Sequence, residues 1–185
     1  MKTILVTNQK GGVGKTTVAD ELAFALERRG YNVCFQNLDP QGMVLHSPSI
    51  PDEETDYYVI DTPPTLSPDF SRWCRAADVI IMPTRASTFD LRPLQRCYEL
   101  AKKSKTKAKI GILVNFYDPR RLADADFVVF LQNAGMMVWG TLPTTTAIIQ
   151  AQGLQISVAE HKKQSKAAIA FDDLADKVLK ELNND

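Results

Sequence analysis

The most informative segment of this sequence is Asn8-Gln9-Lys10-Gly11-Gly12-Val13-Gly14-Lys15-Thr16-Thr17, which follows a short apolar run and precedes a stretch with helical periodicity. A strand, a glycine-rich loop and the start of a helix form the context that a phosphate-binding loop requires. Glycines let backbone N–H groups approach the phosphates, and the helix N-terminus adds the positive end of its dipole. Lys15 would then reach the β- and γ-phosphates, and the Thr16 hydroxyl would bind Mg²⁺. The residues expected to contact the nucleotide here are Gly11, Gly12, Val13, Gly14, Lys15, Thr16 and Thr17.

Short β-rich apolar runs alternate with helical segments along the rest of the chain, a pattern typical of a parallel sheet with crossover helices. Most of the runs are continuously apolar, as expected for strands covered on both faces. The sequence therefore predicts one doubly wound α/β domain over residues 1–185, with a mainly parallel sheet and helices on both faces. Its one long irregular segment is Gln41–Thr55. The predicted strands are Thr3–Thr7, Asn32–Leu38, Tyr57–Asp61, Asp78–Met82, Lys109–Asn115 and Met136–Leu142, and the predicted helices are Lys15–Arg29, Pro68–Ala76, Leu91–Lys103, Leu122–Ala134 and Ser165–Leu182.

Composition excludes several classes of protein. The 185 residues are 44% hydrophobic and carry 22 Lys and Arg against 22 Asp and Glu, which argues against disorder and against a uniformly basic nucleic-acid coat. No apolar run approaches the roughly 18 residues that a membrane span needs. The cysteines Cys34, Cys74 and Cys97 are odd in number and far apart, so we expect buried reduced thiols rather than disulfides, a structural zinc site or an iron–sulfur cluster. We expect a soluble, cytoplasmic protein.

Two aspartates end predicted strands next to the phosphate loop. Asp39 lies in Asn37-Leu38-Asp39-Pro40-Gln41-Gly42, and Asp61 lies in Tyr57-Tyr58-Val59-Ile60-Asp61-Thr62-Pro63-Pro64. The carboxyl ends of parallel strands meet at one edge of a sheet, so both side chains should lie near the phosphates. An aspartate at the tip of a buried strand is the Walker B arrangement, which holds a carboxylate toward Mg²⁺ or its water. We expect Thr16 and Asp61 to hold the metal ion with Asp39 close by, and a plain turn is the alternative for Asp39-Pro40.

The glycine loop departs from the common P-loop pattern, which requires glycine where this chain has Gln9, and it places Lys10 before the glycine pair. This K-G-G-x-G-K-[ST]-T form resembles the deviant Walker A motif of the ParA/MinD superfamily of P-loop ATPases, and the D-P-Q-G and D-T-P-P segments resemble its ParA branch. The resemblance implies ATP and Mg²⁺ as cofactors and an ATP-dependent homodimer in which Lys10 reaches the partner's phosphates. It also implies that Asp39 orients the attacking water and joins Thr16 and Asp61 in holding the metal. The first aspartate of the family's D-x-D-P-Q-G signature is replaced by Asn37, which removes a charge from the metal surroundings.

The same resemblance suggests a pocket for the base. Asn115 ends the fifth predicted strand, where family members place an asparagine on the adenine edge, and Pro143 follows the sixth strand, where a proline loop flanks the base. Asparagine and proline are also ordinary residues at strand ends, so a structural role is the alternative for both.

Charge is unevenly distributed along the chain. Residues 1–100 hold 10 Lys and Arg against 13 Asp and Glu, whereas residues 101–185 hold 12 against 9. ParA-type ATPases bind DNA non-specifically through basic residues near the C-terminal helix, and by resemblance this chain would use Lys162, Lys163 and Lys166. Binding through phosphate contacts needs no contact with a base. A solvated face is the alternative for these lysines, and it is the preferred interpretation for the Lys102–Lys109 run.

The final predicted helix has one apolar stripe and a polar face with an excess of acidic residues, which favours packing on the sheet over binding to a membrane. We therefore predict a small ParA-type ATPase that partitions a plasmid or positions another cargo, associates with the nucleoid when ATP is bound, and is stimulated by a partner of the ParB kind. Two alternatives remain: a metabolic or assembly P-loop enzyme, and a regulatory module that binds nucleotide without turnover.

Overall fold

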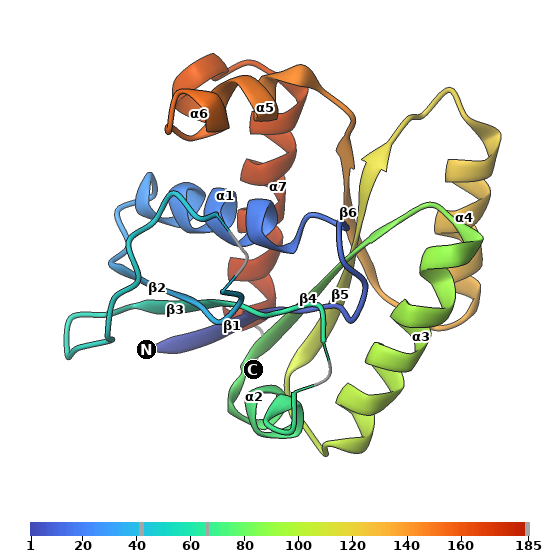
Figure 1. Ribbon diagram of the computed structural model, residues 1–185, viewed down its shortest axis with the longest axis horizontal. Helices are drawn as coiled ribbons and strands as arrows, with labels where there is room; N and C mark the ends of the chain where they lie inside the picture. The colour runs from blue at the N-terminus through green and yellow to red at the C-terminus, as the bar shows by residue number, and fades with distance from the viewer. Residues whose placement is uncertain (41–42, 66, 184–185) are drawn as a thin grey trace.

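The computed structural model describes residues 1–40, 43–65 and 67–183, and within them the chain forms a parallel sheet of six strands in the order β2-β3-β1-β4-β5-β6 (Figure 1). The strands are β1 (Lys2–Val6), β2 (Val33–Asn37), β3 (Tyr57–Asp61), β4 (Val79–Arg85), β5 (Lys109–Tyr117) and β6 (Val138–Pro143). The helices are α1 (Lys15–Glu27), α2 (Phe70–Ala76), α3 (Thr88–Lys103), α4 (Leu122–Asn133), α5 (Thr146–Gly153), α6 (Val158–Lys162) and α7 (Lys166–Asn183). The predicted doubly wound α/β class is confirmed.

The helices cover the two faces of the sheet as two separate packed layers. Helices α1, α5, α6 and α7 share one core with the sheet, in which Phe35, Val59 and Phe171 are buried. Helices α2, α3 and α4 form the other core, in which Ile80 and Met82 are buried (Figure 1). Each strand sends alternate side chains to opposite faces, so the continuously apolar strands serve both cores at once.

Most predicted elements begin or end one to three residues away from their bounds in the structure. Strand β4 continues to Arg85 because Arg85 pairs with Asn115 of β5, and β5 continues to Tyr117 because Tyr117 pairs with Pro143 of β6. Helix α3 begins three residues earlier than predicted, because the Ser87 side chain accepts a hydrogen bond from the Phe89 N–H and caps it.

Helices α5 and α6 are absent from the sequence prediction. Each carries a start signal that was available: Thr145 accepts a hydrogen bond from the Ala147 N–H, and Ser157 forms a capping box with Glu160. Both helices are short, with too few turns to show a clear apolar period. Helix α6 ends at Lys162, one of the lysines predicted to bind DNA.

The predicted packing of the final helix is confirmed. Helix α7 buries Phe171, Leu174 and Val178 against the sheet and α1. No helix in the described ranges is long and apolar enough to cross a bilayer. The three cysteines are buried and free, as predicted.

The irregular segment after β2 is held against α1. Gln41 and Gly42 lie outside the described residues, and residues 43–55 contain no helix or strand. The carboxylate of Asp20 accepts hydrogen bonds from the Leu45 N–H at 2.9 Å and from the His46 N–H at 3.1 Å. The His46 ring lies 2.9 Å from Asp20 through Nδ1 and 3.3 Å from Glu27 through Nε2. This connection, which has no regular structure of its own, is thus anchored to the helix that begins at the phosphate loop.

Candidate nucleotide site

The glycine loop joins β1 to α1 at the carboxyl edge of the sheet. Gly12 and Gly14 have φ angles of +72° and +89°, which glycine adopts without strain. The Asn8 side chain holds the loop at its base, since its amide donates to the Pro83 carbonyl at 2.7 Å and its oxygen accepts from the Lys10 N–H at 3.0 Å. The backbone therefore has the shape of an anion cradle at a helix N-terminus.

Lys15 lies inside this cradle and is 6% exposed. Its ammonium donates to the Lys10 carbonyl at 3.5 Å. Burial lowers the pKa of Lys15, and the carboxylates of Asp61 and Asp39 oppose that shift. A buried cation with carboxylates nearby and open space in front of it is suited to an anionic ligand.

Asp61 lies at the tip of β3 and is fully buried. The Thr16 hydroxyl donates to its Oδ2 at 2.6 Å, whereas its Oδ1 is buried with no hydrogen-bond partner among the described residues. Burial raises the pKa of Asp61 to about 6, although the Thr16 hydrogen bond and Lys15 act against it. An unpaired buried carboxylate oxygen next to a threonine hydroxyl fits a hard divalent cation, for which oxygen ligands are preferred.

Asp39 lines the same space. Asp39, Met43 and Pro64 line a cavity of about 290 Å³ together with Gly11, Gly12, Gly14, Lys15, Thr16 and Thr17. Asn37, which stands where the family has its first aspartate, accepts a hydrogen bond from the Asp39 N–H at 2.8 Å. Its amide therefore shapes the turn that carries Asp39. No group of three or more His, Cys, Asp and Glu side chains suited to a metal occurs in the described part of the chain.

A second cavity adjoins the first. It has a volume of about 250 Å³ and shares Gly14 and Thr17 with the phosphate cavity. The structure brings the predicted Asn115 and Pro143 together there, although they lie on different strands. The sequence prediction missed the other apolar walls of this cavity. Ile148 and Ile149 lie on α5, which was not predicted, whereas Phe116, Leu142 and Phe171 come from β5, β6 and α7, which only the tertiary structure brings together.

The predicted DNA-binding lysines lie at one junction of the fold. Lys162 is the last residue of α6, Lys163 follows it, and Lys166 begins α7, all with exposed side chains. Lys166 also lines a groove of about 880 Å³ with Arg120 and Arg121, two arginines to which the sequence prediction gave no role.

The Lys102–Lys109 run lies elsewhere. It precedes β5, so it occupies the amino edge of the parallel sheet, opposite the phosphate loop. Lys109 donates to the Glu181 carbonyl at 2.7 Å, and Lys102 lies 5.5 Å from the centre of the Tyr98 ring. The solvated face preferred for this run stays a prediction.

The fold and the glycine loop define a P-loop nucleotide-binding protein. Residues 4–158 match the family model described as the CobQ/CobB/MinD/ParA nucleotide binding domain, and the chain belongs to this family.

Its relatives include proteins that position large objects in cells. The chain is 27% identical to the chromosome-partitioning ATPase Soj of Thermus thermophilus over 240 residues, covering 97% of this chain and 96% of Soj. It is 27% identical to the maintenance of carboxysome distribution protein A of Halothiobacillus neapolitanus, over 75% of this chain and 77% of that protein.

Solved structures with the same fold serve different functions. The MinD cell division protein of Aquifex aeolicus has a TM-score of 0.78 and 17% identity, covering 97% of both chains. Cobyrinic acid a,c-diamide synthase of Mycobacterium smegmatis, with bound ATP analog and magnesium, has a TM-score of 0.77 and 20% identity, covering 100% of this chain and 96% of that one. At these identities the structures agree in fold, and the function has to be argued from the site.

Proposed function

We propose that this chain is an ATPase of the ParA type that binds ATP with Mg²⁺, dimerises when ATP is bound, and then binds DNA without sequence preference to position a plasmid or another cargo. The observation that carries this proposal is the pair of adjoining cavities, one walled by the glycine loop, Lys15 and Asp39, and the other by apolar side chains with Asn115. A polar cradle next to an apolar slot matches a nucleotide, which has a charged tail and a flat base.

Metal binding would use the groups that now face each other. Thr16 would bind Mg²⁺ through its hydroxyl oxygen, and Asp61 would hold the ion directly or through a water molecule, using its unpaired Oδ1. Bound Mg²⁺ would neutralise charge on the phosphates during their transfer. Asn115 and Pro143 would contact the base from the ends of β5 and β6.

Hydrolysis would depend on two further residues. Asp39 would orient the attacking water, since it lines the phosphate cavity. Lys10 would act on the phosphates of a second copy in the ATP-bound dimer. In related nucleotide hydrolases a cation supplied in this way accelerates the reaction by about 10³–10⁵-fold.

DNA binding would use the exposed lysines at the α6–α7 junction, and the family resemblance of the motifs supports this role together with the named functions of Soj and its relatives. A partner protein of the ParB kind would stimulate hydrolysis and so release the dimer from DNA. The protein would then be cytoplasmic and would associate with the nucleoid in its ATP form.

A steady-state ATPase assay with and without duplex DNA tests the proposal. We expect slow turnover that needs Mg²⁺ and that changes when DNA is added. A turnover rate that is the same with and without DNA would instead favour a metabolic or assembly enzyme. Tight nucleotide binding by calorimetry with no turnover under either condition would favour a regulatory module, the alternative that Asn37 keeps open.

A further inference from the structure

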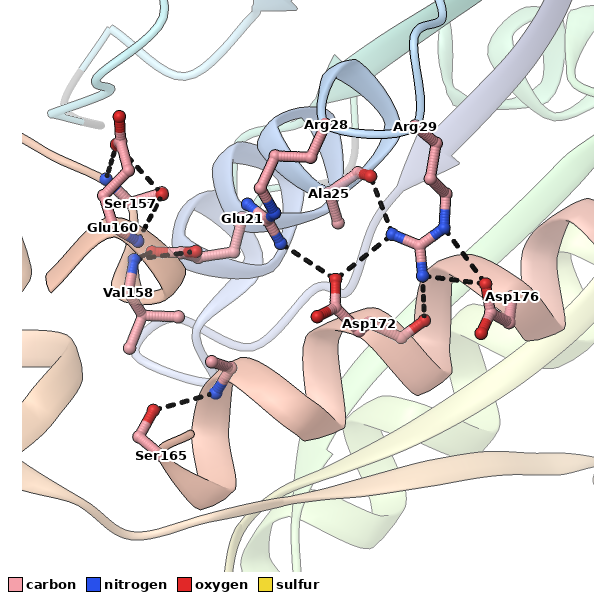
Figure 2. Close-up of polar contacts among 11 residues, drawn as sticks. Glu21, Ala25, Arg28, Arg29, Ser157, Val158, Glu160, Ser165, Asp172 and Asp176 are labelled. Carbon is pink, nitrogen blue, oxygen red and sulfur yellow. Dashed lines mark hydrogen bonds and ion pairs between the residues drawn. The ribbon is translucent and has the colours of Figure 1, made fainter. Parts of the chain in front are cut away.

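One side of α1 is joined by hydrogen bonds to each of the three C-terminal helices. Near its start, Thr17 accepts a hydrogen bond from the Gln152 side chain of α5 at 3.2 Å. One turn later, the Glu21 carboxylate accepts the Val158 N–H at 2.9 and 3.2 Å, at the first residue of α6 (Figure 2). Residues 17 and 21 are four apart and therefore lie on the same side of the helix.

Arg28 and Arg29, the two residues that directly follow α1, join its other end to α7. The Arg29 guanidinium donates to the Asp172 carbonyl at 2.9 Å and to its carboxylate at 3.1 Å, and also to Asp176 at 2.7 Å (Figure 2). Arg28 donates to Asp172 at 2.9 Å. The planar guanidinium makes such multiple contacts geometrically specific.

Glu21 is the unusual member of this set because it is 1% exposed. Burial raises its pKa to about 7, although the Val158 N–H and Arg28 act against that shift. A buried carboxylate costs more desolvation energy than an apolar side chain of the same volume, so its presence needs a reason other than stability. Helix α6 already has its own cap, in which the Glu160 N–H donates to the Ser157 hydroxyl at 3.2 Å. What Glu21 adds is a connection between α6 and α1.

This connection links the nucleotide site to the predicted DNA-binding lysines. Helix α1 begins with Lys15 and Thr16, and Thr16 now donates its hydroxyl hydrogen to Asp61. The Thr16 hydroxyl oxygen can bind a metal ion while its hydrogen is still donated to Asp61, so an ion bound there would act directly on the first turn of α1. A packed helix responds as a unit, so a shift at its first turn is carried to Glu21.

We propose that Glu21 is a positioning residue that transmits the nucleotide state of the phosphate loop through α1 to α6, and thereby sets the placement of Lys162 and Lys163. This inference rests on the proposed function, since it names the coupling between the two sites. Couplings between sites of this kind typically change affinity by about 5–150-fold.

Two variants remove the hydrogen bond between Glu21 and the Val158 N–H, one by changing the acceptor and the other by changing the donor. Glu21→Ala removes the acceptor, and Glu21→Gln keeps one as the conservative control. Val158→Pro removes the donor and leaves Glu21 in place, and it is the second variant if Glu21→Ala does not fold. Proline is favoured at the first position of a helix, and Ser157 before it has φ −67° and ψ 155°, which a following proline accepts. Glu160→Ala is the matched control, because it weakens the cap of α6 without touching α1.

Hydrogen–deuterium exchange of residues 156–166, with and without a non-hydrolysable ATP analogue and Mg²⁺, tests the coupling without DNA. In the wild type and in Glu21→Gln, we expect the analogue to change the exchange of this segment. In Glu21→Ala and Val158→Pro we expect that difference to vanish while the dissociation constant of the analogue stays within about threefold. Glu160→Ala should exchange faster in both states and keep the difference. The inference is overturned if Glu21→Ala retains the wild-type difference, or if the wild type shows none.

Affinity for duplex DNA in the ATP-analogue and ADP forms supplies the second measurement. The ratio of the two affinities should fall to within about twofold of one in Glu21→Ala and be kept in Glu21→Gln. A wild type that binds no DNA in either form would contradict the proposed function, whereas the exchange experiment would still decide the coupling.

Discussion

The side-chain amide of Asn115 lies directly against the α-carbon of Gly14, so that a β-carbon at position 14 would lie 2.2 Å from Asn115 Nδ2. The same amide donates to the Val13 carbonyl at 2.9 Å. Asn115, near the end of β5, therefore packs against the glycine loop on the side of the loop that borders the apolar cavity. Glycine at position 14 satisfies two requirements at once, because its φ of +89° also disfavours other residues.

Gly14→Ala should therefore lower nucleotide affinity by at least about tenfold and destabilise the fold by about 1–3 kcal/mol, the usual range for a strained backbone. Calorimetry and denaturant unfolding measure the two effects. Gly153→Ala is the control, since no atom lies within 4 Å of the added carbon and its φ is not positive. That control should keep full affinity; an equal loss in both variants would contradict the explanation.

Asp61→Asn tests the metal site. The change removes a buried charge but keeps a group that accepts the Thr16 hydroxyl, so the nucleotide-free protein should unfold with an equal or larger free energy. Its Mg²⁺-dependent gain in nucleotide affinity should be lost. Titration with nucleotide in the presence and absence of Mg²⁺ measures this gain. If Mg²⁺ raises the nucleotide affinity of Asp61→Asn as much as that of the wild type, Asp61 does not help to bind the ion.

Lys10→Ala tests the role of the lysine that precedes the glycine pair. Since Lys10 contributes its carbonyl rather than its ammonium to the contact with Lys15, loss of the side chain should leave nucleotide affinity within about threefold. Turnover should fall by about 10³-fold or more if its ammonium acts on the phosphates of a second copy. Unchanged turnover in the ATPase assay would rule out that role.

The double substitution Lys162→Ala and Lys163→Ala tests the surface of the α6–α7 junction. Each phosphate contact contributes about 0.9 to the slope of log affinity against log salt, so the slope should become shallower by about 1.8. Filter binding or fluorescence anisotropy over a series of salt concentrations measures it. The pair Lys102→Ala and Lys103→Ala, at the opposite edge of the sheet, should leave the slope unchanged.

The ion pairs of His46 predict a pH dependence of stability. Burial alone lowers the pKa of His46, but the carboxylates of Asp20 and Glu27 raise it to about 9. The folded state therefore holds the proton more tightly than the unfolded chain, whose histidine titrates near 6.5. Protonated His46 therefore stabilises the fold fully below pH 6.5, and this stabilisation is lost as the pH rises through 9. The difference between the folded and unfolded pKa values corresponds to about 3 kcal/mol in the free energy of unfolding.

Denaturant unfolding from pH 6 to pH 10 should show this loss in the wild type but not in His46→Gln. Asp20→Asn should flatten the profile in the same way, since Asp20 holds both the ring and the backbone of His46. Parallel profiles for the wild type and His46→Gln would show that His46 does not titrate between folded and unfolded states.

Much of the nucleotide site is predictable from the sequence because its signals are local. Glycines before Lys15 and Thr16 indicate the loop, and an aspartate after an apolar strand indicates Asp61. The order of strands and helices is predictable for the same reason, since apolar period and helix-ending glycines act over a few residues. The short helices α5 and α6 are missed because their start signals are not accompanied by a long apolar period.

The remaining features depend on contacts between residues far apart in the chain. Asn115 closing on Gly14, Asp20 binding His46, and Glu21 binding the Val158 N–H each arise when packed elements bring side chains within reach. Local sequence determines which groups carry the phosphate-binding chemistry, because that chemistry uses the backbone of one loop and one helix end. Only tertiary packing determines which of these groups are buried, which are joined, and how the loop is connected to the C-terminal lysines, because burial and distance are properties of the folded whole.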